Sequence, residues 1–106
     1  MSLERVIKAL IGLGLTTFDA EIYVYLAKKG PNKAITLAGS LNYNKPKIHA
    51  SLKHLQTRGL VTKVNIIFSA LPFEEALELL IKTKKEQAQA LQESKEALLV
   101  TWETKD

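Results

Sequence analysis

The chain has 106 residues, of which 46% are apolar, and a formal net charge of +4 at neutral pH. This length suffices for one small hydrophobic core and leaves little room for a second. The sequence contains no cysteine, which excludes disulfides and thiolate metal sites, and no apolar run approaches the roughly 18 residues of a membrane span. Because the N-terminal segment also lacks the pattern of a signal peptide, we expect a cytoplasmic protein without membrane contact.

The charge is distributed unevenly along the chain. Residues 1–71 carry ten Lys and Arg against three acids, a net +7, whereas residues 72–106 carry five against eight, a net −3. No acid occurs between Glu21 and Glu74, although eight Lys and Arg fall there. A field of one sign over half of a small protein favours a polyanionic partner such as nucleic acid. We expect residues 1–71 to form a DNA-binding domain and residues 72–106 to have a different role.

Three short helices are predicted before position 42. The first covers residues 3–11 and is followed by two glycines, and the second covers residues 16–29 and is followed by a Gly-Pro pair. Thr16 and Asp19 have the spacing of a capping box at the start of the second helix. The third, over residues 34–41, lacks a good N-cap, so its position must come from packing. The predicted buried stripe of the second helix consists of Ala20, Tyr23, Leu26 and Ala27.

A fourth helix carries a basic face. Asn44 is a favourable N-cap, a proline fits the first turn, and the helix runs to Arg58 before a glycine. Helical spacing places one apolar stripe at Ile48, Leu52 and Leu55. The opposite face consists of Pro46, Ala50, Lys53 and Thr57, flanked by Lys47, His49 and His54. The exposed face is therefore basic and small at its centre.

Two β-branched runs follow the fourth helix. Residues 60–64 and 66–70 are separated by Asn65, which predicts a tight hairpin because asparagine readily adopts positive φ. Three helices with a short turn between the last two, closed by a hairpin, are the elements of a winged helix-turn-helix. We therefore expect a mainly α fold of the α+β winged-helix class, with a long C-terminal helix.

Residues 13–61 carry a family resemblance. They contain a leucine-glycine-leucine-threonine start, an acidic-alanine step, a glycine-proline turn and the ending RGLV, and LPFEEALELLI follows the hairpin. These motifs resemble the N-terminal winged helix-turn-helix domain of the TrmB family of archaeal transcription regulators, in a stand-alone form, over about residues 3–81. Larger members also carry a C-terminal sugar-binding domain, which does not follow here, so we expect no small-molecule effector domain.

The resemblance implies that the helix from Asn44 to Arg58 is a recognition helix in the major groove of duplex DNA. The wing departs from the family pattern because its loop is reduced to Asn65, so we do not expect it to contact the minor groove. The candidate DNA-binding residues are Asn44, Lys45, Lys47, His49, Ala50, Lys53, His54, Lys33 and Lys63.

The C-terminal segment predicts a dimerisation helix. Residues 72–103 form a candidate continuous helix, ~48 Å long at 1.5 Å per residue. A seam at alternating steps of four and three is apolar except for lysine at two of its eight positions, and several of its apolar residues would remain in water if the helix were alone. We expect a homodimer through an antiparallel coiled coil, with candidate dimerisation residues Leu77, Ile81, Ala88, Leu91, Leu98 and Trp102. The alternative is that this seam packs within the monomer against the first helix.

The predicted function is double-stranded DNA binding by a TrmB-like transcriptional regulator, associated with the nucleoid. Low to modest sequence specificity is expected, because the recognition face offers Lys and His rather than Arg, Asn or Gln. One alternative is an architectural chromatin protein that binds DNA without sequence preference. Another is a winged-helix module of the transcription machinery that docks an acidic protein.

Neither enzymatic activity nor a cofactor is expected. The sequence shows no Gly-rich phosphate loop, no nucleophile beside a base and no paired carboxylates suited to acid–base work. A metal site is not expected either, because His49 and His54 lie on different faces of their helix and no nearby carboxylate or cysteine completes a ligand set.

Overall fold

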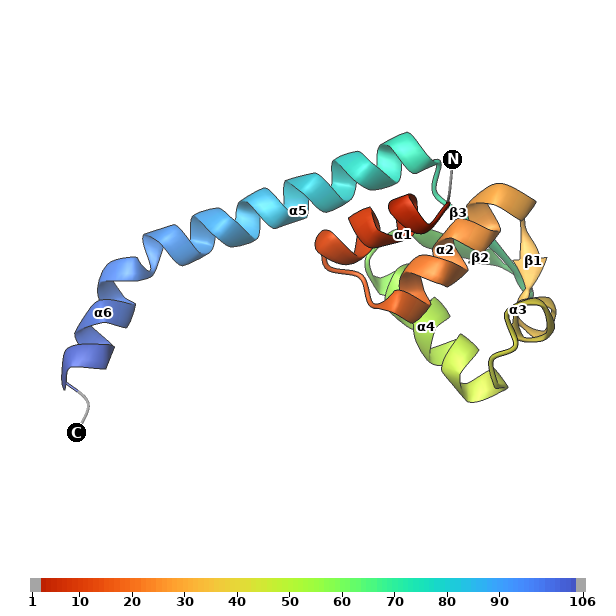
Figure 1. The fold of residues 1–106 in the computed structure, drawn as a ribbon, viewed down its shortest axis with the longest axis horizontal. Coiled ribbons are helices and arrows are strands. Elements are labelled where there is room, and N and C mark those ends of the chain that lie inside the picture. The colour runs from red at the N-terminus through yellow and green to blue at the C-terminus, as the bar shows by residue number, and fades with distance from the viewer. Residues whose placement is uncertain (1–2, 105–106) are drawn as a thin grey trace.

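A computed structural model describes residues 3–104 and shows a globular part with a helical arm (Figure 1). In chain order the elements are α1 (Leu3–Gly12), α2 (Thr17–Lys29), β1 (Asn32–Lys33), α3 (Ala34–Leu41), α4 (Lys45–Thr57), β2 (Val61–Val64), β3 (Ile67–Ala70), α5 (Phe73–Glu93) and α6 (Lys95–Thr104). Helices α1 to α4 and the small sheet form the globular part, and α5 leaves it. The predicted α+β winged helix-turn-helix with a long C-terminal helix is confirmed.

The predicted capping residues start their helices. The Thr16 hydroxyl accepts the backbone N–H of Asp19 at 3.1 Å, and the Asn44 side chain accepts that of Lys47 at 3.0 Å. Such an N-cap satisfies an otherwise unpaired donor of the first turn and stabilises the helix by about 1 kcal/mol. No described side chain caps the start of α3, in keeping with its weak sequence signal. Asn42, in the left-handed region with φ 61°, ends α3 and starts the turn to α4.

Helix α2 is enclosed from several sides. Elements α1, α4 and β3 all pack against it, and its buried residues are Asp19, Ala20, Ile22, Tyr23, Val24 and Leu26. The predicted burial of Ala20, Tyr23 and Leu26 is confirmed, whereas that of Ala27 is wrong because Ala27 is exposed. A single apolar stripe is the pattern of a helix with one buried face, so it misses Ile22 and Val24 in a helix that packs on three elements and wrongly includes Ala27 in the last, exposed turn.

The sheet has three antiparallel strands in the order β1-β3-β2. β2 and β3 form the predicted hairpin, in which Val64 pairs with Ile67 and Asn65 takes φ 57° in the turn. The prediction of a loop reduced to Asn65 is wrong by one residue, because Ile66 also belongs to the turn. β1 pairs with the first two residues of β3. The sequence does not predict β1, because two residues carry no alternating pattern. This short pairing places the start of α3 beside the hairpin, which is the wing of the fold.

The C-terminal helix is interrupted at Ser94, so the prediction of one continuous helix over residues 72–103 is wrong in this respect. The backbone N–H of Ser94 is shared between the carbonyls of Ala90 at 3.1 Å and Leu91 at 3.2 Å, and its hydroxyl donates to the Ala90 carbonyl at 2.8 Å. A side-chain bond of this kind, together with the shared backbone N–H, often accompanies a bend in a helix. Figure 1 shows the resulting change of direction between α5 and α6.

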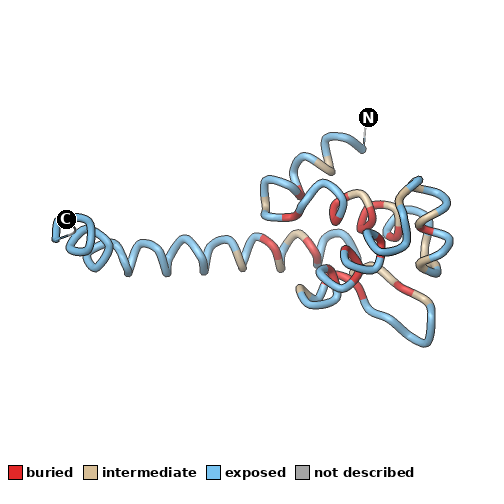
Figure 2. The backbone as a smooth tube through the Cα atoms, turned by 90° about the horizontal axis from the view of Figure 1, so that it is seen from below, coloured by how far each residue is buried: buried red, intermediate tan, exposed pale blue. Residues whose placement is uncertain are grey.

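Only the first turns of α5 belong to the hydrophobic core. Ala76 and Leu80 are buried against the globular part, and Leu77 is half-buried there. Farther along, the apolar side chains are exposed, by 65% at Leu91 and by 75% at Trp102 (Figure 2). The described part of the seam beyond these first turns is therefore not covered by α1 of the same chain.

Replacing Leu80 by alanine tests whether α5 is an integral part of the domain. Leu80 is 2% exposed, so its truncation leaves a cavity between α5 and the core and lowers the free energy of unfolding by about 2–5 kcal/mol. Ile35→Ala, at a side chain that is 60% exposed, is the control and changes stability by less than about 0.5 kcal/mol. Urea unfolding followed by circular dichroism measures both. Equal, small effects would contradict the packing of α5 on the domain.

Candidate nucleic-acid interface

The exposed face of α4 carries most of the predicted DNA-binding residues. Ile48, Leu52 and Leu55 are buried and hold the helix against the core. The opposite side is exposed at Lys45, Lys47, His49, Ala50, Lys53 and His54. Because the helix is anchored along one apolar stripe, its basic side chains point away from the core together. The arrangement agrees with the face predicted from helical spacing.

Four predicted residues from three different elements meet around one hollow. Lys33 of β1, Lys45 and His49 on α4, and Lys63 on β2 line a depression of about 250 Å³. The lining also includes Ile35 of α3 and two apolar residues of the wing, Ile66 and Phe68. The Lys63 ammonium lies 5.3 Å from the centre of the Phe68 ring. This hollow has no acidic lining residue, so it is suited to an anionic group such as a phosphate.

A pair of aromatic rings holds Lys47. Its ammonium lies 3.9 Å from the centre of the Phe18 ring and 5.8 Å from that of Tyr43, and the two rings meet edge to face at 5.0 Å. A cation over an aromatic face is attracted by the ring quadrupole. Sequence reasoning misses this cluster: the spacing of four between Tyr43 and Lys47 is a weak signal, and Phe18 comes from the distant α2.

The Tyr43 hydroxyl is fastened to α2. It donates a hydrogen bond to the Glu21 carboxylate, and this bond, together with burial, raises the pKa of Tyr43 to about 12. An anionic acceptor favours the neutral phenol, which is the form that can donate. The contact also occupies Glu21, one of the few acids in residues 1–71, away from the basic face of α4.

His54 and Ala50 lie beside a second hollow, between α4 and the start of α2. Its floor includes Asp19, which is 5% exposed and accepts a hydrogen bond from the Ser51 hydroxyl. The Nδ1 atom of His54 lies 3.7 Å from an Asp19 carboxylate oxygen. His54 is thus placed near the α2 side of α4, whereas His49 lines the hollow beside the wing. The two histidines stand on different faces, as predicted.

Two residues at the ends of α4 have structural contacts. The side-chain oxygen of Asn44 is engaged as the N-cap, which leaves its amide nitrogen as the atom for a DNA contact. Arg58 donates to the Gly14 carbonyl at 3.1 Å and so ties the end of α4 to the loop between α1 and α2. Lys53 is exposed between these ends, and its carbonyl accepts the Thr57 hydroxyl at 2.9 Å. The freely presented lysines of α4 are therefore Lys45 and Lys53, whereas Lys47 is restrained by the Phe18 and Tyr43 rings.

Two other functional classes receive no support from residues 3–104. No group of three or more His, Asp or Glu side chains in this range is arranged to hold a metal ion. Over the same residues, no helix has the length and apolar character needed to cross a membrane.

Replacing Glu21 by glutamine tests the Tyr43 contact. Exchange of the carboxylate for a neutral amide weakens the hydrogen bond to residue 21, which is the largest cause of the raised pKa, and removes the smaller effect of the negative charge, so the pKa of Tyr43 falls from about 12 toward its ordinary value of 10.0. Ultraviolet absorbance of the phenolate, followed against pH, measures this change. The same titration of Tyr43→Phe identifies which part of the signal belongs to Tyr43. An unchanged Tyr43 titration in Glu21→Gln would contradict the contact.

Comparison with known proteins agrees with this geometry. The family model described as "Sugar-specific transcriptional regulator TrmB" matches residues 10–74. An uncharacterized protein of Methanocaldococcus jannaschii is 29% identical over 82 residues, which are 69% of this chain and 62% of that protein. The chain thus matches less than two thirds of that relative's length.

A solved structure supports the fold independently. The crystal structure of a MarR-like transcriptional regulator from Thermotoga maritima superimposes with a TM-score of 0.54 at 16% identity, over 99% of both chains. At this identity the likeness concerns the fold alone. The family match, in contrast, spans more than half of the chain. The protein is therefore a member of the TrmB family of transcriptional regulators, with the winged-helix DNA-binding fold of that class.

Proposed function

We propose that the chain binds double-stranded DNA through the exposed face of α4 and regulates transcription with low to modest sequence specificity. The observation that carries this proposal is the hollow lined by Lys33, Lys45, His49 and Lys63, which joins α4 to the wing without an acid. Lysine side chains on neighbouring elements can contact successive phosphates while the helix lies in the major groove. Family membership supports the same role.

The chemistry of α4 supports limited specificity. Most hydrogen bonds to DNA go to phosphates, which position a protein, whereas contacts to base edges specify sequence. The exposed face offers Lys45, Lys47 and Lys53, and an ammonium group lacks the planar pair of donors with which arginine recognises guanine. Ala50, which is exposed at the centre of this face, leaves space for close approach of the helix and can contact a thymine methyl group.

The proposed active form is a homodimer in which residues 1–71 bind DNA and residues 72–106 mediate association. Supporting this, α5 and α6 carry exposed Leu91, Leu98 and Trp102, which a second copy could cover. An antiparallel pair of these arms is our preferred arrangement. A two-fold dimer would present two α4 helices to half-sites separated by ~34–36 Å or a multiple of it.

An architectural role is the second candidate. It is favoured by the same excess of lysine over arginine on α4, because phosphate contacts alone bind duplex DNA without regard to sequence. Selection of binding sites from random duplexes distinguishes the two. Recovery of a short, partly conserved motif supports a regulator, and recovery of no motif supports the architectural role.

The DNA-binding proposal predicts a salt-dependent affinity that falls when lysines of α4 are removed. In fluorescence anisotropy with a mixed-sequence duplex, each lost phosphate contact lowers the slope of log K against log salt by ~0.9, measured between about 50 and about 200 mM salt. Lys45→Ala and Lys53→Ala are each expected to weaken binding and to reduce the slope by this amount. Lys82→Ala, on the exposed part of α5, removes the same charge at a distance and leaves the slope unchanged.

The result that would contradict the proposal is equally specific. If the unaltered chain does not bind duplex DNA at the lower salt concentration, α4 is not a DNA-binding face under these conditions. If Lys45→Ala, Lys53→Ala and Lys82→Ala all reduce the salt dependence of the affinity equally, binding depends on total charge rather than on the lysines of α4.

A further inference from the structure

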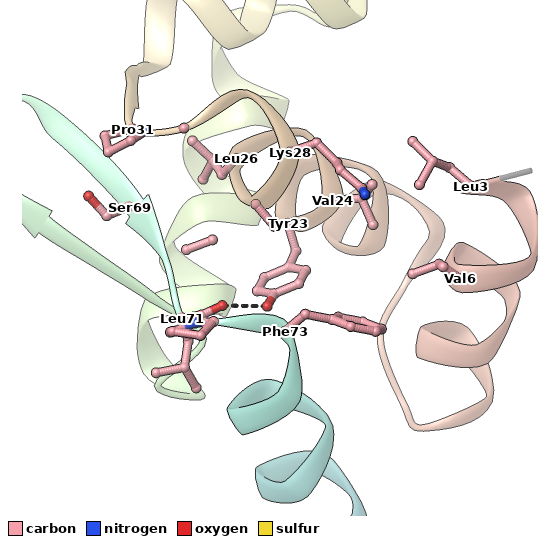
Figure 3. A pocket seen from close by; sticks show the side chains of 14 residues that line it. Leu3, Val6, Tyr23, Val24, Leu26, Lys28, Pro31, Ser69, Leu71 and Phe73 are labelled. Atoms are coloured by element: carbon pink, nitrogen blue, oxygen red, sulfur yellow. Dashed lines mark hydrogen bonds between the residues drawn. The ribbon is translucent and has the colours of Figure 1, made fainter.

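An apolar hollow lies where the arm joins the globular part (Figure 3). It has a volume of about 380 Å³ and lies between α1, α2, the end of β3 and the start of α5, with Leu3, Val6, Val24, Ala27, Lys28 and Phe73 among its lining residues. The Tyr23 hydroxyl in this lining donates to the Leu71 carbonyl, so both polar groups are satisfied. What remains for a guest is mainly apolar surface, with the Ser69 hydroxyl and the Lys28 ammonium group as polar side-chain groups of the lining.

Helix α6 presents apolar side chains that nothing in residues 3–104 covers. Their exposed fractions are 56% at Leu98, 46% at Leu99, 56% at Val100 and 75% at Trp102. Consecutive residues of a helix point in different directions, so these side chains surround α6 rather than form one stripe. This spread exceeds what contact with one partner helix along a single stripe would cover. It cannot reach its own hollow, because the 21 residues of α5 separate the two by ~31 Å.

We propose that the hollow beside α1 and Phe73 receives α6 of a second copy of the chain, with Trp102 of the partner subunit as the anchor. This inference rests on the proposed homodimer and adds to it a contact between the arm and the globular part. In an antiparallel pair of arms, α6 of the partner subunit lies alongside the first turns of α5, where Phe73 lines the hollow. A tryptophan side chain at that point is next to the hollow.

The bend at Ser94 and the charges agree with this occupant. The bend turns α6 out of the line of α5, which lets the last turns leave the helix pair and lie on the neighbouring domain. Helix α6 carries Glu96 and Glu103 against Lys95, a net charge of −1, and the hollow is lined by Lys28 and by no acid, so opposite charges meet when α6 of one copy lies on the hollow of the other. Glu103 of the partner subunit, beside the anchoring tryptophan, is then available to Lys28.

A functional consequence follows from this contact. If only the arms paired, each DNA-binding domain would be fixed to the dimer through its own α5 alone. When α6 lies in the hollow, it also contacts α1 and α2 of the other subunit and fixes that domain at a second site. Since α4 packs on α2, the contact sets the distance between the two α4 helices of the dimer. The spacing of DNA half-sites would then depend on Trp102.

Trp102 is the only tryptophan in the chain, so its fluorescence reports on this site directly. At concentrations where light scattering gives the dimer mass, emission is expected to be blue-shifted relative to the urea-unfolded chain and protected from acrylamide. Leu3→Ala and Phe73→Ala are each expected to reverse more than half of that shift. Ile11→Ala is the matched control: it lies on the same α1 helix and is 39% exposed against 43% for Leu3, but it does not line the hollow, so the spectrum stays unchanged.

Cross-linking tests the contact without relying on stability, because the chain has no cysteine of its own. An Ala27→Cys chain is mixed with a Glu103→Cys chain and mildly oxidised, and the mixed covalent dimer is the expected product. Ala27→Cys mixed with Gln89→Cys, a position near the middle of the paired arms, is the control and gives no mixed dimer.

Several outcomes would overturn the proposal. If Trp102 of the dimer is exposed to acrylamide, the tryptophan lies outside the hollow. The same follows if its emission is blue-shifted but is not changed by Leu3→Ala or Phe73→Ala. A small molecule that co-purifies in native mass spectrometry, with Trp102 exposed, assigns the hollow to that ligand. A monomer mass at all concentrations removes both this contact and the proposed dimer, whereas failure of the DNA titration leaves the contact unaffected. The DNA-binding proposal and the proposed contact of α6 with the hollow can therefore fail independently of each other.

Discussion

The contact between α2 and α4 positions the rest of the molecule. Asp19, near the start of α2, is 5% exposed, and its carboxylate accepts a hydrogen bond from Ser51 of α4. Rotation of α4 by one residue would withdraw Ser51 and leave the buried carboxylate without this partner, at a cost of about 1–3 kcal/mol. This polar pair lies beside the buried Ile48, Leu52 and Leu55 of α4, so packing and hydrogen bonding favour one orientation of the helix. The same orientation directs the lysines of α4 outward.

Polar residues around α4 divide into those that build the fold and those that remain available. Asn44 caps the helix, and Arg58 bonds to Gly14. Lys47 has an intermediate position, since the Phe18 and Tyr43 rings restrict its ammonium without burying it. A cation restrained in this way loses less side-chain entropy when it contacts a phosphate. The basic residues between Glu21 and Glu74 therefore have two roles. Arg58 stabilises the domain, whereas the exposed lysines of α4 form its basic surface.

The sequence alone predicts the elements that depend on local chemistry. The N-caps at Thr16 and Asn44, the turn at Asn65 and the basic face of α4 follow from residue type and helical spacing. Features set by long-range packing were not predictable in this way: β1, the enclosure of α2 and the rings around Lys47 all need partners distant in the chain. The break at Ser94 is local, but it depends on a competition for carbonyl groups that apolar periodicity does not report.

The central claim is that one face of this domain, and not its general charge, contacts DNA. Amide chemical shifts of the nitrogen-15-labelled chain, recorded during titration with a duplex, test it most directly. The largest changes are expected along the exposed side of α4 and at Lys33 and Lys63, which line one hollow with Lys45 and His49. Changes of similar size spread over all lysines, or concentrated in α5 and α6, would contradict it.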